Sequence, residues 1–279
     1  DYLEFLSKGL GEDDSINELK TEGFIRLGDY VDLPFLYVDG YQGLYDDPDY
    51  EFLGKIDEST NPDLGIDSYS GQVIGWLLRI MVVGRNSFNP GAGNSEYKGG
   101  VEEAMPHLVM QFQNSPVKRP IYGKKESMAY AGSDMRKYLV KVSSPEVLEE
   151  GNFTKGLIAA GVPMDTDIIW APNREISNTA QTDVDKIKDK LWIPTEWEMF
   201  GFGLLSNTTL ENKYNQAVLE YYLGAREIKK YNKSGGDANC WNASPVAGDS
   251  SHGGRLFNNS FTSSWVNLPD GVTPAFCVK

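Results

Sequence analysis

The sequence predicts an α+β fold. Its apolar segments are short, and they change irregularly between the two-residue period of strands and the longer period of helices. They lack the regular strand–helix succession that would predict a parallel α/β sheet. The chain of 279 residues is 40% hydrophobic and 12% aromatic, which supplies enough apolar material for a sizeable core. No internal repeat and no sharp change of composition divides it.

Runs rich in β-branched and aromatic residues predict the strands. The first runs lie within residues 23–39 and are interrupted by Gly28 and Pro34. The most hydrophobic run, residues 71–83, predicts a buried strand that leads into a long loop rich in turn residues. Two further segments are predicted to be strands: residues 106–114 and 167–172.

Capping residues mark two of the predicted helices. Ser133 precedes a helical segment as a suitable N-cap. Thr195 and Glu198 have the spacing of a capping box, so a second helix is predicted to begin after a turn at Pro194. The remaining helical segments are residues 1–20, 153–160 and 212–228, and residues 229–238 are predicted to form a polar loop.

The composition argues against several classes of function. The formal net charge of −14 argues against a nucleic-acid partner, because a phosphate backbone requires a basic surface. No apolar run reaches the roughly 18 residues of a transmembrane helix, so no membrane insertion is expected. The acidic residues 46–67 lack the spacing of a dedicated calcium loop and are predicted to form a solvated loop, with a calcium site as the alternative. No metal site and no cofactor are otherwise expected.

The two cysteines, Cys240 and Cys277, are too few for a disulfide scaffold or a zinc site. Two buried thiols are the expected state, although strand pairing between the ends of the C-terminal region would bring the cysteines together. No basic neighbour that would lower the pKa of either thiol is evident in the sequence.

The C-terminal region, residues 239–279, combines a rigid frame with a polar run. Five residues are predicted to pack inward as that frame: Trp241, Pro245, Pro274, Phe276 and Cys277. Between them, residues 248–264 are mostly short hydrogen-bonding side chains, with Phe261 among them and Trp265 directly after them. This composition is typical of an ordinary solvated loop and also of an adaptable binding surface.

Three motifs in the chain resemble a known family: Trp192-Ile-Pro-Thr-Glu-Trp-Glu-Met-Phe-Gly, Cys240-Trp-Asn-Ala-Ser-Pro and Gly271-Val-Thr-Pro-Ala-Phe-Cys. They look like the tails of uncharacterised gut bacterial and phage domains, which are similar to the C-type-lectin-like fold of the formylglycine-generating type. That fold includes the variable proteins of diversity-generating retroelements and some phage receptor-binding proteins. Two departures from the family pattern are Asn242-Ala243, where Leu-Arg is usual, and Thr273, where Arg is usual.

The resemblance covers residues 71–279 and implies a C-type-lectin-like domain there, with a ligand-binding region at residues 239–279. Residues 1–70 are then an attachment arm or part of the main body. In such a fold the segment before the last strand is displayed on one face of a rigid scaffold. The candidate ligand-binding residues are Asn242, Asp249, His252, Arg255, Asn258, Asn259, Thr262 and Trp265.

The resemblance implies a non-enzymatic ligand- or receptor-binding protein of a phage particle or bacterial surface, located on the virion or outside the cell. Its expected partners are a host-surface protein or glycan, together with virion neighbours or further copies of the chain. A structural virion or surface subunit is the first alternative. A formylglycine-generating-type enzyme that uses Cys240 and Cys277 is the second, although neither cysteine lies in a catalytic motif.

Overall fold

The structure of the chain is a computed structural model. It describes residues 25–39, 52–54, 72–92, 97–101, 103–115, 118–122, 130–144, 147–150, 168–169, 174–177, 184–203, 205–206, 217–223, 230–231, 237–247, 249–257, 260–268 and 270–278. The fold in this part of the chain is mixed: it consists mostly of β-sheet, with a few short helices. This mixture is consistent with the predicted α+β class and also with a largely β fold.

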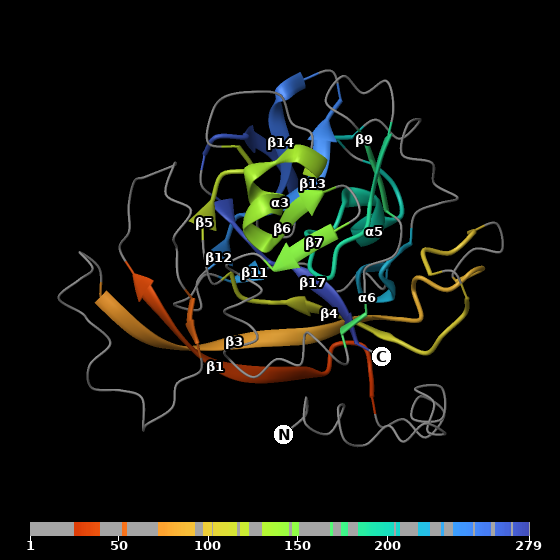
Figure 1. Ribbon diagram of the computed structural model, residues 1–279, viewed down its shortest axis with the longest axis horizontal. Coiled ribbons are helices and arrows are strands. Elements are labelled where there is room, and N and C mark those ends of the chain that lie inside the picture. The colour runs from red at the N-terminus through yellow and green to blue at the C-terminus, as the bar shows by residue number, and fades with distance from the viewer. Residues whose placement is uncertain are drawn as a thin grey trace.

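The first sheet contains strands from both ends of the described chain. Its order is β2-β1-β3-β4-β17-β8, and all its pairings are antiparallel. Figure 1 shows the β1–β3 ribbon running along one side of the molecule, with the second sheet and the helices on the other side of it. Its strands are β1 (Tyr30–Asp39), β2 (Phe52–Gly54), β3 (Gln72–Arg85), β4 (Leu108–Phe112), β8 (Ile168–Ile169) and β17 (Ala275–Val278).

The second sheet is built mainly from the C-terminal region. Its order is β15-β14-β13-β16-β5, in which only the contact between β13 and β16 is parallel among the described strands. Its strands are β5 (Lys118–Arg119), β13 (Cys240–Val246), β14 (Asp249–Phe257), β15 (Ser260–Trp265) and β16 (Asp270–Gly271).

Short elements surround the two sheets. Three described pairs of strands lie outside them: β6 (Val140–Ser144) with β7 (Val147–Glu150), β9 (Arg174–Ser177) with β10 (Val184–Ile187), and β11 (Lys230–Tyr231) with β12 (Asp237–Ala238). The described helices are the 3₁₀ turn η2 (Tyr130–Gly132), α3 (Asp134–Leu139), α5 (Glu196–Phe200) and α6 (Glu220–Leu223).

One hydrophobic core takes side chains from both sheets. Every residue of β4 and of β17 is buried, so these central strands are covered on both faces. Phe112 and Phe276 meet edge to face, with ring centroids 6.3 Å apart. The five residues predicted to pack inward from the C-terminal region are all buried, as expected.

Most local predictions that fall on described residues are confirmed. The segments 71–83 and 106–114 contain strands, and Thr195 and Glu198 form a complete capping box at the start of α5. Two predictions are wrong. Residues 217–219 are not helical, because Leu219 N donates to the Glu198 carbonyl, and the predicted loop 229–238 contains β11 and β12. Residues 1–20, residues 153–160 and most of residues 46–67 lie outside the described residues.

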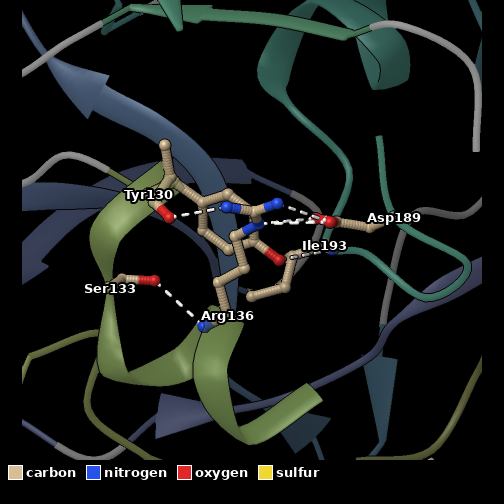
Figure 2. Close-up of polar contacts among 6 residues, drawn as sticks. Tyr130, Ser133, Arg136, Asp189 and Ile193 are labelled. Atoms are coloured by element: carbon tan, nitrogen blue, oxygen red, sulfur yellow. Dashed lines mark hydrogen bonds and ion pairs between the residues drawn. The ribbon is translucent and has the colours of Figure 1, made fainter. Parts of the chain in front are cut away.

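A buried ion pair fixes α3 against the segment that leads to Trp192. Ser133 caps the helix by accepting a hydrogen bond from Arg136 N at 3.0 Å, as predicted. The Arg136 guanidinium then binds Asp189 through two atoms, with Nη2–Oδ1 at 2.7 Å and Nε–Oδ2 at 2.9 Å (Figure 2). Its third nitrogen donates to Ala131 O at 2.8 Å. The Asp189 side chain is fully buried, so α3 is held to this segment by a desolvated, bidentate contact.

Candidate ligand-binding site

The polar run that was predicted to be a displayed segment forms two strands. β14 and β15 are antiparallel neighbours, and β15 is the last strand of the second sheet in its described order. Side chains along β14 and β15, the antiparallel pair called the ribbon below, therefore alternate between the two faces of a sheet. In a loop, by contrast, they could all have pointed toward one ligand.

The register of the ribbon divides the predicted residues between two faces. His252 lies opposite Trp265, and Arg255 lies opposite Thr262. Because His252 and Arg255 are an odd number of residues apart on one strand, their side chains point to opposite faces. The expectation that all candidate residues share one face is therefore wrong.

Asp249, His252 and Trp265 form a cluster where β14 begins and β15 ends. The rings of His252 and Trp265 lie 3.9 Å apart between centroids, at an angle of 37°. His252 Nδ1 lies 2.6 Å from Asp249 Oδ2. Since Nδ1 is held by the carboxylate, Nε2 is the remaining hydrogen-bonding atom of the imidazole, and it has no partner among the described residues.

Ser251 fixes the carboxylate of this cluster. Its hydroxyl and its backbone N–H both donate to Asp249 Oδ1, at 2.7 and 2.9 Å. These two bonds hold the pKa of Asp249 below its ordinary value, so the side chain is a carboxylate at neutral pH. It is nevertheless 43% exposed, and its oxygens remain accessible to a ligand.

Trp265 is the aromatic group of the cluster and is 37% exposed. Tryptophan is usually mostly buried, and aromatic residues are enriched in protein contact surfaces. Packing against His252 limits the rotation of the ring. The cluster can therefore offer an oriented aromatic surface, a carboxylate and one imidazole nitrogen to the same ligand.

Arg255 and Thr262, on the opposite face, belong to a different environment. Arg255 Nη1 lies 3.2 Å from Asp270 Oδ2, and the Asp270 side chain is only 10% exposed. The guanidinium thus stabilises a nearly buried carboxylate of β16. Thr262 is half-buried beside it. The structure does not bring this pair together with Trp265.

The other predicted residues do not add to the cluster. Asn242 is fully buried, and its Oδ1 accepts a hydrogen bond from Ser244 N at 2.8 Å, so the prediction that it faces a ligand is wrong. Asn258 and Asn259 lie outside the described residues. Phe261 packs against Phe200, with ring centroids 4.3 Å apart.

Sequence reasoning missed a buried polar network around Lys230. This lysine is 1% exposed, and its amine donates to Phe112 O at 3.1 Å and to the Tyr222 hydroxyl at 3.0 Å. It is also the basic neighbour of Cys240 that the sequence did not reveal. A single lysine in a polar stretch gives no sequence signal for burial.

Both cysteines are free, buried thiols, as expected. They lie in different sheets, Cys240 in β13 and Cys277 in β17. Burial raises the pKa of Cys240 to about 12 despite the opposing effect of Lys230. A reactive thiolate is therefore not formed at Cys240 near neutral pH.

Within the described part of the chain, no group of three or more His, Cys, Asp or Glu side chains is arranged to hold a metal ion. None of the helices described has the length and hydropathy needed to span a bilayer. No family model, no curated protein and no solved structure matches the chain.

Proposed function

We propose that the chain is a non-enzymatic ligand- or receptor-binding protein of a phage particle or bacterial surface, and that Asp249, His252 and Trp265 form the centre of its contact surface. One observation carries this proposal: an exposed tryptophan packs on an imidazole whose Nδ1 is held by a carboxylate. Groups fixed in this way lose little conformational freedom on binding, which favours affinity.

The chemistry of the cluster suits a neutral or polar ligand on a host surface, either a glycan or a protein loop. The Trp265 ring supplies apolar contact area, while Asp249 supplies acceptor oxygens for hydroxyl or N–H donors. The net charge of −14 disfavours a polyanionic ligand such as a nucleic acid.

We further propose that the fold is C-type-lectin-like, of the formylglycine-generating type, and that the chain is similar to the variable proteins of diversity-generating retroelements. The closing strand β17 lies inside the first sheet between β4 and β8, and the antiparallel pair β14–β15 precedes it in the chain, with only the short strand β16 between them. This arrangement supports a rigid scaffold that carries a replaceable polar ribbon.

Alanine substitutions test the contact surface. Trp265→Ala and His252→Ala should each abolish binding of the labelled protein to a glycan array or to gut bacterial cells, and leave the melting temperature nearly unchanged. Leu268→Ala is the matched control, because Leu268 is an apolar residue that is 43% exposed, against 37% for Trp265, and lies outside strands β14 and β15. Unchanged binding by both cluster variants, or unfolding of both, would disprove the assignment.

A structural virion or surface subunit remains the alternative that a specific observation favours. Phe202 and Leu223 are 49% and 57% exposed; Phe202 follows Gly201 in the chain, and a Cβ atom built on Gly201 would lie 3.6 Å from Leu223 Cδ2. Exposed apolar groups of this size favour burial against a neighbouring subunit. Phe202→Asp combined with Leu223→Asp should then lower the oligomeric state in analytical ultracentrifugation. A wild-type chain that stays monomeric at every concentration would remove this alternative.

The enzyme alternative gains no support from the described residues. It requires reactive cysteines, and burial keeps the Cys240 thiol protonated. If Cys240→Ser and Cys277→Ser abolished a turnover by the wild-type chain, this alternative would replace the binding proposal.

A further inference from the structure

Three buried side chains form a continuous chain of hydrogen bonds in the core. Lys230 Nζ donates to the Tyr222 hydroxyl, and that hydroxyl donates to Gln111 Oε1. The Gln111 amide nitrogen in turn donates to Thr273 O at 3.0 Å. All three side chains are at least 95% removed from solvent. One hydroxyl group therefore connects the amine of Lys230 with the carboxamide of Gln111.

The lysine of this chain is a potential nucleophile. Burial lowers the pKa of Lys230 to about 7, so much of the amine is neutral under physiological conditions. A neutral amine has two N–H donors, and the Phe112 carbonyl and the Tyr222 hydroxyl accept both. The nitrogen lone pair is left for a reaction.

The carboxamide of Gln111 is the matching electrophile. The Tyr222 hydroxyl donates to its oxygen, which polarises the C=O bond in the way an oxyanion-stabilising donor does. Burial raises the pKa of Tyr222, so this hydroxyl keeps its proton. The neighbouring thiol of Cys240 is a weak competitor, because it too remains protonated.

We propose that Lys230 and Gln111 form an intramolecular isopeptide bond without an external enzyme. Lys230 Nζ attacks Gln111 Cδ while its proton passes through the Tyr222 hydroxyl to Oε1. The resulting tetrahedral centre collapses, the Nζ–Cδ bond remains and the Cδ–Nε2 bond breaks. Nε2 leaves as ammonia with the transferred proton. No redox partner is needed, and Tyr222 is regenerated.

The product would join β4 to β11 through the core. β4 is a central strand of the first sheet, and β11 pairs with β12 outside it. Proximity favours the reaction, because the fold holds both groups around one hydroxyl before any bond forms. The bond would form whether or not the chain binds a ligand at Asp249, His252 and Trp265.

Intact-mass spectrometry of the purified full chain, incubated at pH 8.5, tests the proposal. The wild-type mass should fall by the mass of one ammonia. A proteolytic digest should then contain a branched peptide that links the segments around residues 111 and 230. Lys230→Met should show no loss of ammonia, whereas the exposed Lys137→Met should behave as wild type.

The wild-type measurement decides the matter even if Lys230→Met fails to fold. A wild-type mass equal to that of the unmodified sequence after prolonged incubation overturns the proposal. A loss of ammonia that maps to any other pair of residues also overturns it. Bond formation that is faster at pH 8.5 than at pH 6 supports attack by the neutral amine.

Discussion

Asn242 is a polar residue of β13 that is packed into the core. It lies against Gly254 of the neighbouring strand β14. Asn242 lies in β13, is fully buried and bonds to the backbone of Ser244. A Cβ atom built on Gly254 would lie 2.5 Å from Asn242 Nδ2 and 2.7 Å from its Oδ1. β14 can therefore approach β13 at this point only because residue 254 has no side chain.

Gly254→Ala should destabilise the protein by about 1–3 kcal/mol, because the new methyl group overpacks a buried amide. Gly132→Ala is the matched control, since a Cβ at that position has no neighbour closer than Tyr122 Oη at 3.9 Å. Urea denaturation of both variants measures the difference. Equal stability of the two variants would mean that Asn242 can move aside.

At the scale of elements, the Arg136–Asp189 pair decides how α3 is placed. Arg136→Met leaves the fully buried Asp189 carboxylate without its bidentate partner, and should cost about 3–5 kcal/mol. Lys137→Met removes an ion pair with Asp134 whose side chains are 63% and 54% exposed, and should cost less than about 1 kcal/mol. Thermal unfolding of the two neighbouring variants provides the comparison, and similar losses would contradict it.

Local signals in the sequence predict local structure well, and pairing between distant segments poorly. Thr195 and Glu198 lie within one turn, so their capping box is visible in the sequence. The contact between His252 and Trp265 depends instead on the register of β14 against β15, which no short motif specifies. The split of Arg255 and Trp265 between two faces has the same cause.

The burial of Lys230 depends on an even longer-range contact. Tyr231, its neighbour in β11, exchanges backbone hydrogen bonds with Gln113 and Ser115, which directly follow β4. These bonds place the Lys230 side chain in the buried interior. The residues around it in the sequence are polar and predict a solvated loop. The burial of Lys230 is set by how the sheets assemble, so the residues next to it in the sequence do not predict it.

At the scale of the whole molecule, the same buried groups predict how stability depends on pH. The folded-state pKa of Lys230 is about 7, below its ordinary value of 10.5, so folding releases a proton between these values. The free energy of unfolding should therefore rise from pH 7 upward, by up to about 1.4 kcal/mol per pH unit. Cys240 acts in the opposite direction above pH 9, because its pKa is raised from 9.0 to about 12. Tyr222, whose pKa is also raised by burial, adds to that decline at higher pH.

In chains where Lys230 and Gln111 are not linked, stability should consequently rise from about pH 7 to about pH 9 and stay level while the effects of Lys230 and Cys240 offset each other. It should fall above about pH 10, where Tyr222 adds to the decline. Urea unfolding from pH 6 to pH 11 measures the profile, and Lys230→Met should lose the rise between pH 7 and pH 9. An amide nitrogen does not titrate in this range, so cross-linked chains should lack that rise as well. The intact mass and the pH dependence of stability thus report independently on the Lys230–Gln111 bond. If the mass is unmodified and stability does not rise between pH 7 and pH 9, Lys230 does not occupy this buried position in solution.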